Sequence, residues 1–124
     1  MAKKILIVDD ETDVLTYLTE LFSDNGYDCL TAANGKIAMY KTIAGKPDLI
    51  TLDITMPEES GVRFFRDVQD NEFTKNIPII IITGISTDFK KFIQSRKQVK
   101  PPAGYFEKPI DKELLLGKVK ELIG

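Results

Sequence analysis

Two hydrophobic periods alternate along the chain. Short aliphatic runs predict strands, and longer segments with apolar residues three or four positions apart predict amphipathic helices. The strands are expected at Ile5–Val8, residues 28–32, Leu49–Leu52, Ile79–Ile82 and residues 104–107. The helices are expected from residue 13 to a stop at Asn25-Gly26, at about 35–44 with Gly45 closing the helix, at about 61–69, around 88–95, and at 111–123.

The alternation of strands and helices predicts an α/β fold with a doubly wound parallel sheet. Helices cover both faces of such a sheet, so its strands read as continuous aliphatic runs rather than as alternating apolar and polar residues. The four isoleucines of Ile79–Ile82 are a run of this kind. Because 124 residues suit one domain, we expect a single five-stranded domain over residues 1–124.

The composition excludes several classes of site. The chain has no histidine, which rules out serine–histidine and cysteine–histidine nucleophile pairs and most zinc sites. The single cysteine, Cys29, rules out an internal disulfide and is interpreted as a small core or edge residue rather than a reactive thiol. No apolar stretch is long enough to span a membrane and no signal peptide opens the chain, so a cytoplasmic protein without membrane contact is expected.

Charge is spread unevenly along the chain. The net charge is −2, but residues 1–60 carry 5 basic and 11 acidic side chains, whereas residues 61–124 carry 12 and 8. This distribution is not that of a nucleic-acid-binding domain, so no direct nucleic-acid binding is expected. The densest basic run, residues 90–100, is interpreted as a solvated helix face, with a partner-binding surface as the alternative.

Polar side chains follow four of the five predicted strands. Asp9 and Asp10 follow the first strand, Asp53 the third, Thr83 the fourth and Lys108 the fifth. Ligands of open parallel sheets bind beyond the carboxyl ends of the strands, so these side chains should converge on one pocket. Each residue alone has an ordinary explanation, since Asp10 could cap a helix, Thr83 could form a turn and Lys108 could be a surface lysine. Together they indicate a site.

The residue types in this pocket suit phosphoryl transfer. Three neighbouring carboxylates repel each other unless a cation neutralises them, and their oxygens are hard ligands that suit Mg²⁺. A carboxylate beside that cation can attack phosphorus and form an aspartyl phosphate. A lysine and a hydroxyl nearby would bind the remaining phosphoryl oxygens.

With these motifs, the sequence resembles the receiver domains of two-component response regulators over essentially its whole length. The motifs are IVDD with Asp9 and Asp10, LDITMPEESG with Asp53, IITG with Thr83, and EKPI with Lys108. The resemblance implies the flavodoxin-like strand order 2-1-3-4-5. It also implies that Asp53 accepts a phosphoryl group from a sensor histidine kinase or a phosphotransfer protein, with Mg²⁺ required.

The resemblance further implies a ligand set for Mg²⁺. By matching position, Asp10 would bind the metal directly and Asp9 mainly through water. Asp53 and the backbone carbonyl of Thr55 would supply the other protein ligands.

The resemblance also implies a conformational switch. Thr83 and Tyr105 match the switch hydroxyl and the switch aromatic, and Lys108 matches the lysine that pairs with the phosphate, followed by a cis bond to Pro109. The switch would remodel the face formed by residues 88–95, 104–107 and 111–123, and so control a downstream protein or an output domain absent from this chain. A phosphorylation-dependent homodimer is left open.

Two features depart from the family pattern. Thr83 and Lys108 lie 25 positions apart, somewhat more than is usual, and the segment KQVKPPAG replaces a run of small residues before the last strand. Ile85 is apolar where many members carry a polar residue. With Thr55 it is expected to flank the route of the attacking water and to set the lifetime of the phosphoryl group.

Three other interpretations compete with a signalling switch. A haloacid-dehalogenase-type phosphatase also uses an aspartate nucleophile after a strand, but it needs a second aspartate where this chain has Thr55. A flavin carrier needs a phosphate-binding loop after the first strand, where DDETD would repel a phosphate monoester. A degenerate receiver that only binds partners would not require all of Asp9, Asp10, Asp53, Thr83 and Lys108.

Overall fold

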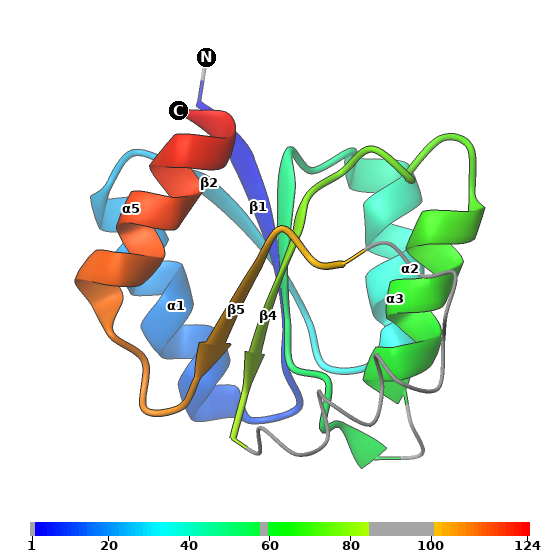
Figure 1. Ribbon diagram of the computed structural model, residues 1–124, viewed down its shortest axis with the longest axis horizontal. Coiled ribbons are helices and arrows are strands. Elements are labelled where there is room, and N and C mark those ends of the chain that lie inside the picture. Colours follow the sequence, from blue (N-terminus) through cyan, green and yellow to red (C-terminus); the bar gives the residue numbers. More distant parts are fainter. Residues whose placement is uncertain (1, 58–59, 85–100) are drawn as a thin grey trace.

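The computed structural model describes residues 2–57, 60–84 and 101–124 (Figure 1). Five strands form its sheet: β1 Lys4–Val8, β2 Asp28–Ala32, β3 Leu49–Leu52, β4 Ile79–Thr83 and β5 Gly104–Glu107. Its helices are α1 Thr12–Asp24, α2 Gly35–Gly45, α3 Ser60–Asp70 and α5 Lys112–Ile123. The helix predicted around residues 88–95 lies outside the described residues, as does Ile85.

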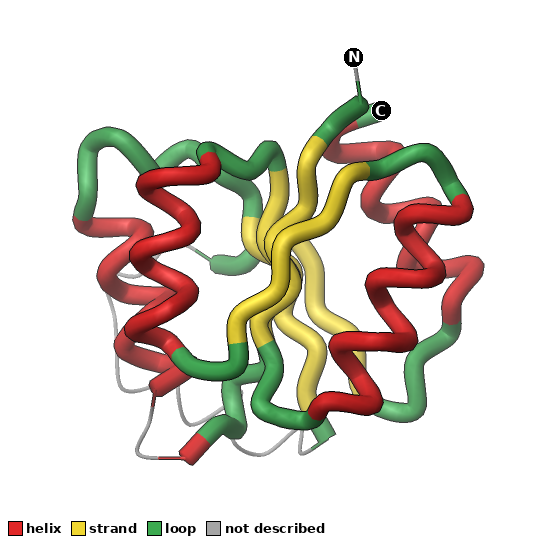
Figure 2. Tube along the Cα trace, turned by 180° about the vertical axis from the view of Figure 1, so that it is seen from behind, coloured by secondary structure: helices red, strands yellow, loops and turns green. Residues whose placement is uncertain are grey.

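The strands form one parallel sheet in the order β2-β1-β3-β4-β5, which confirms the predicted fold class and strand order. Helices α1 and α5 cover one face of the sheet, and α2 and α3 cover the other (Figures 1 and 2). Strand β2 is at one edge and β5 at the other, so the three strands between them are hydrogen-bonded on both sides. Because such strands are also covered by helices on both faces, β1 and β4 contain unbroken aliphatic runs.

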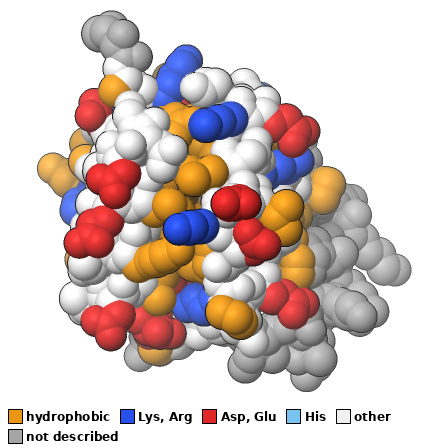
Figure 3. Space-filling model, turned by 90° about the vertical axis from the view of Figure 1, so that its left-hand side faces the viewer, with side chains coloured by type: hydrophobic (Ala, Val, Ile, Leu, Met, Phe, Trp, Pro, Cys, Tyr) orange, Lys and Arg blue, Asp and Glu red, His pale blue; other side chains and the backbone are white. Residues whose placement is uncertain are grey.

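Two hydrophobic cores lie on the two sides of the sheet. Successive residues of a strand point to opposite faces, and β1 divides its side chains accordingly. Ile5 and Ile7 belong to the core under α1 and α5, whereas Leu6 and Val8 belong to the core under α2 and α3. On the outer surface of the layer formed by α1 and α5, hydrophobic side chains gather in a band between the two helices, with acidic side chains on both sides (Figure 3).

Two helix ends differ from those predicted by the sequence, at the start of α1 and at the end of α2. Helix α1 does end before Asn25-Gly26, but its N-cap is Glu11 and not Asp10, and the Glu11 side chain makes no capping hydrogen bond. Helix α2 includes Gly45 as its last residue, and Lys46 takes the left-handed conformation with φ 49°. Gly45 lies close to β2: a Cβ there would lie 2.6 Å from Leu30 Cδ1, so the end of the Leu30 side chain would have to shift.

Cys29 is half-buried on the edge strand β2, packed against the core under α1 and α5, as the sequence predicts for a small edge residue. Burial raises the pKa of its thiol, and the neighbouring hydroxyl of Ser23 acts in the opposite direction. A thiol with a raised pKa is protonated and weakly nucleophilic at neutral pH. Among the described residues, no helix has both the length and the apolar character needed to cross a membrane.

Candidate functional site

The carboxyl ends of β1 and β3 place Asp9 and Asp53 side by side. The two strands pair with Val8 opposite Leu52, and the Asp53 N–H donates to the Val8 carbonyl at 2.9 Å. Both aspartates therefore leave the sheet at the same level. Each is only 2% exposed, so two carboxylates are buried next to each other at this edge.

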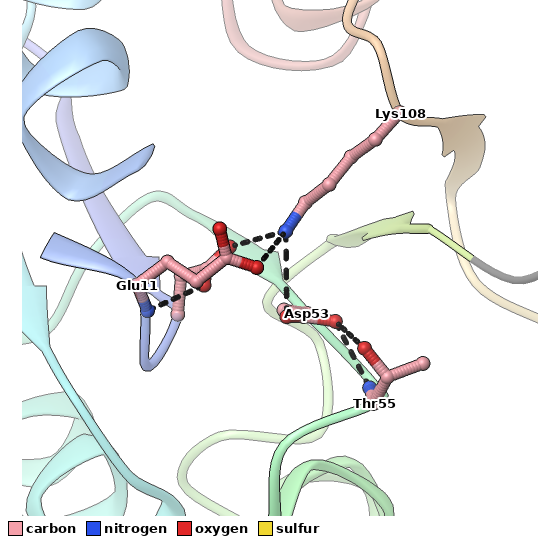
Figure 4. Close-up of polar contacts among 5 residues, drawn as sticks. Glu11, Asp53, Thr55 and Lys108 are labelled. Atoms are coloured by element: carbon pink, nitrogen blue, oxygen red, sulfur yellow. Dashed lines mark hydrogen bonds and ion pairs between the residues drawn. The ribbon is translucent and has the colours of Figure 1, made fainter. Parts of the chain in front are cut away.

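Lys108 reaches these carboxylates from the edge strand β5. Its backbone N–H donates to the carbonyl of Thr83 at 2.8 Å, which continues the pairing of β5 with β4 by one residue. Its ammonium lies 3.2 Å from Asp9 Oδ2, 3.4 Å from Glu11 Oε1 and 3.5 Å from Asp53 Oδ2 (Figure 4). One cation therefore bridges acidic groups from two strand ends. The Lys108–Pro109 peptide bond is cis, as predicted.

Burial dominates the electrostatics of Asp9. The pKa of this carboxyl is raised from 3.8 to about 6, mainly by burial and in part by repulsion from Asp53, against the lowering effects of the Glu11 backbone N–H and of Lys108. For the Lys108 ammonium, burial alone would lower the pKa, but attraction to Asp53 and Asp9 outweighs it and the net pKa is raised. The pocket holds more negative charge than one lysine compensates.

The carboxylate of Asp53 is held in one orientation by Thr55. Both the backbone N–H of Thr55, at 2.9 Å, and its hydroxyl, at 2.6 Å, donate to Asp53 Oδ1, while Oδ2 faces Lys108 (Figure 4). The backbone here is also confined, because a Cβ on Gly61 would lie 2.6 Å from the Asp53 carbonyl oxygen and 2.9 Å from Ile54 Cα. A glycine at this position lets α3 begin directly against the segment that carries Asp53.

Four acidic residues offer oxygens to a common point. Carboxylate oxygens of Asp9, Asp10, Glu11 and Asp53 lie within 4.8 Å of one another, with the first and last buried and the other two exposed. An all-oxygen set with an open, exposed side suits Mg²⁺, which keeps several waters when it binds protein carboxylates. A divalent cation here would relieve the repulsion that contributes to the raised pKa of Asp9. The residues therefore fit a magnesium site.

The sequence identified most of the residues that the structure brings together. Asp9, Asp10, Asp53 and Lys108 do converge on one edge of the sheet. It missed Glu11, which contacts Lys108 and adds an oxygen to the acidic cluster. The signal was present as the third acid of the run DDE, but a glutamate at a helix start is usually read as a favourable dipole interaction.

Two further predicted residues lie near the site with their roles untested. Thr83 is fully buried as the last residue of β4, between the strands that carry Asp53 and Lys108. Tyr105 is half-buried on β5 and packs against the core under α2 and α3, and its hydroxyl donates to Glu107 Oε1 at 3.5 Å. Their roles in a switch stay predictions.

The fold and the pocket define an α/β domain with an acidic cluster and a lysine at the carboxyl edge of its sheet. The family model of the response regulator receiver domain matches residues 5–120, and the chain belongs to this family. Receiver domains are regulatory phosphoacceptors of two-component systems rather than enzymes, and they partner histidine kinases. Membership sets aside the phosphatase and flavin-carrier interpretations, and the acidic pocket is consistent with a phosphoacceptor site.

Individual relatives differ in how much of their length the chain covers. It is 36% identical over 93 residues to the alkaline phosphatase synthesis transcriptional regulatory protein PhoP of Bacillus subtilis, a match covering 75% of this chain but 38% of that protein. It is 31% identical over 120 residues to protein PilH of Pseudomonas aeruginosa, covering 97% of both. Its structure resembles the response regulator TrrA of Thermotoga maritima, solved in complex with Mg²⁺-BeF, with a TM-score of 0.82, 32% identity, and coverage of 98% of this chain and 99% of that one.

Proposed function

We propose that this chain is a phosphorylation-activated signalling switch, with residues 1–124 as one receiver domain and Asp53 as the phosphoacceptor. The observation that carries the proposal is the setting of Asp53. Its carboxylate is buried, is oriented by Thr55, lies 3.5 Å from the Lys108 ammonium and belongs to an acidic cluster with Asp9 and Asp10.

In the proposed reaction, a carboxylate oxygen of Asp53 forms a bond to phosphorus as the bond between phosphorus and the nitrogen of a donor phosphohistidine breaks. Thr55 holds Oδ1 through two hydrogen bonds, so the carboxylate does not need to be oriented at the moment of transfer. Lys108, already drawn into the pocket by carboxylates, would pair with a phosphoryl oxygen as negative charge accumulates there.

The magnesium ligands of this proposal are Asp10, Asp53 and the Thr55 backbone carbonyl, with Asp9 acting mainly through water. Mg²⁺, when bound, would neutralise the pocket and reduce repulsion between the carboxylates and the incoming phosphoryl group. The exposure of Asp10 and the burial of Asp9 are in keeping with a metal that binds on the open side of the pocket.

The output of the switch would follow from a shift between two conformations. A phosphoryl group on Asp53 favours the state in which its oxygens gain Thr83 and Lys108 as partners, and Tyr105 would move with Thr83. The altered face, which includes β5 and α5, would then control a downstream protein, an attached output domain or a homodimer. The donor would be a sensor histidine kinase or a phosphotransfer protein.

The test is the intact mass of the protein after incubation with acetyl phosphate and Mg²⁺. We expect the parent protein to gain one phosphoryl group, and expect no gain in Asp53→Asn or in the parent protein with excess EDTA. A parent protein that gains no phosphoryl group would overturn the proposal. Gain in Asp53→Asn would overturn the assignment of the acceptor.

A further inference from the structure

Helix α2 turns its small residues inward and its large apolar residues outward. Gly35, Ala38 and Thr42 are its buried residues. Ile37 is 42% exposed and Tyr40 is 73% exposed on the other side of the same helix. The remaining large residue of that side, Ile43, is 51% exposed.

The fold explains the small residues of α2 but not the large ones. A Cβ on Gly35 would lie 2.6 Å from the backbone oxygen of Ser60, so α2 packs too closely on α3 for a larger side chain there. Helices α1, α3 and α5, by contrast, bury large apolar residues such as Phe22, Phe64 and Leu115. Single exposed apolar residues are normal on a protein surface. Among the described residues, three of the six large apolar side chains that are exposed lie on this one helix, and apolar side chains gathered in one place are a feature of interaction surfaces.

The spacing of the three residues suits a helical partner. Ile37, Tyr40 and Ile43 are three positions apart, and residues at this spacing are neighbours along a helix surface. They form a continuous ridge, the element that fits into the groove of another helix.

The charge carried by α2 and its C-cap is positive. Lys36 and Lys46 are exposed at the two ends of α2, and no acidic residue occurs between Asp28 and Asp48. This segment is the exception in an acidic half of the chain, because residues 1–60 carry 5 basic and 11 acidic side chains. A partner that complements this surface therefore carries carboxylates beside its apolar residues.

We propose that the outward face of α2, made by Lys36, Ile37, Tyr40, Ile43 and Lys46, is a docking surface for an acidic amphipathic helix of another protein. A symmetric contact between two copies would bring lysines of one α2 against lysines of the other, which is unfavourable. An anionic membrane is also a poorer fit. Recognition of acidic lipid typically needs four to eight basic residues, whereas α2 and its cap contain three lysines, one of which, Lys41, is hydrogen-bonded to the Thr31 carbonyl.

The probe for this surface is a synthetic amphipathic helix of about five turns, with leucines on one face and glutamates flanking them. Its matched control has lysine at every glutamate position. Titrated into the ¹⁵N-labelled protein, the glutamate peptide should shift the amide resonances of α2, and the lysine peptide should bind at least about tenfold more weakly. Reversing the charge of the protein with Lys36→Glu and Lys46→Glu should invert this preference.

The apolar contribution is tested by a triple variant, Ile37→Gln, Tyr40→Gln and Ile43→Gln. We expect it to bind the glutamate peptide at least about tenfold more weakly than the parent protein. The control is Phe73→Gln, which removes a side chain that is 93% exposed in the loop after α3, and should bind like the parent protein. Phosphorylation by acetyl phosphate in all variants verifies that they are folded.

Four outcomes would overturn the proposal. The first two are equal binding of the two peptides and an unchanged affinity of the triple variant for the glutamate peptide. The third is binding to vesicles containing phosphatidylglycerol that is tighter than binding to the peptide and is lost in the triple variant. The fourth is self-association in sedimentation that is lost in the triple variant. The third would assign the face to a lipid surface and the fourth to a second copy of the chain.

Discussion

The acidic pocket and the outward face of α2 both cost the unbound protein free energy, but for opposite reasons. In the pocket, Asp9 and Asp53 are charged groups withdrawn from water, and burial raises the pKa of Asp9 to about 6. On α2, Tyr40 and Ile43 are apolar groups left in water. The chemistry of the group in the unfavourable setting therefore indicates the chemistry of the ligand that would stabilise it. Crowded carboxylates call for a cation and a phosphoryl group, and exposed apolar side chains call for an apolar surface.

The two regions can be separated by mutation because the proposed phosphorylation site and the proposed docking surface have no residue in common.

The largest expected effect is on the chemistry of the pocket. In the double variant Asp9→Asn, Asp10→Asn, the rate of phosphorylation by acetyl phosphate and Mg²⁺ should fall at least about a hundredfold, since two ligand carboxylates are lost. The measurement is the rate of mass gain, with the α2 triple variant as a control that should react at the parental rate. Comparable rates in the double variant and the parent protein would remove these aspartates from the metal site.

The next effect concerns stability without metal. Replacing Lys108 by Met should lower the free energy of unfolding by about 1–3 kcal/mol, because its ammonium offsets the repulsion of Asp9 and Asp53 and is itself partly exposed. The loss should be smaller with saturating Mg²⁺, which replaces the missing positive charge.

Urea denaturation with EDTA or with Mg²⁺ measures both values of the unfolding free energy. The matched control is Lys118→Met, which breaks an exposed ion pair with Glu121 of 3.6 Å and should change stability by less than about 1 kcal/mol. If the two lysine variants lost the same stability, Lys108 would not compensate the buried carboxylates.

A pH dependence follows from Asp9. Its pKa is higher in the folded protein, about 6, than its ordinary value of 3.8, so the folded state binds this proton more tightly. The stability contributed by the protonated carboxyl is therefore fully present below about pH 4 and is lost as the pH rises through 6. In EDTA, Asp9→Asn should match the parent protein near pH 4 and exceed its stability by about 1–3 kcal/mol near pH 7.5. Urea denaturation across this range measures the difference, and a difference that does not change with pH would contradict the prediction.

The sequence predicts the pocket better than the α2 face, for a physical reason. In a parallel sheet, the residues after the strands must converge, so Asp53 and Lys108 could be placed together from the strand assignments alone. The hydrogen bonds from Thr55 to Asp53 and the contact of Glu11 with Lys108 depend on side-chain orientation, which no spacing reveals. In a segment such as α2, apolar residues are distributed around the helix with lysines among them, so there is no periodic signal for which side faces the core.

Gly45 shows the same limit on a smaller scale. A glycine after a helical segment usually indicates a left-handed cap, and the prediction that it closes α2 was reasonable on that basis. In the structure the left-handed position falls on Lys46, and a Cβ on Gly45 would displace the end of the Leu30 side chain on the neighbouring strand. Close approach between elements that are distant in sequence is a tertiary property, and the residue type alone does not distinguish it from a cap.

The smallest expected effect is on stability, and it tests most directly whether the exposed side chains of α2 serve binding or folding. If Ile37, Tyr40 and Ile43 contribute to binding and not to folding, replacing all three by Gln should change the free energy of unfolding by less than about 1 kcal/mol. Glutamine also has a slightly higher helix propensity than isoleucine or tyrosine, which works against any loss. Phe64→Ala, a buried control on α3, should lose about 3–5 kcal/mol in the same urea denaturation. A loss above about 2 kcal/mol in the triple variant would mean that the ridge packs within the folded protein, and the exposed face would then need no partner to explain it.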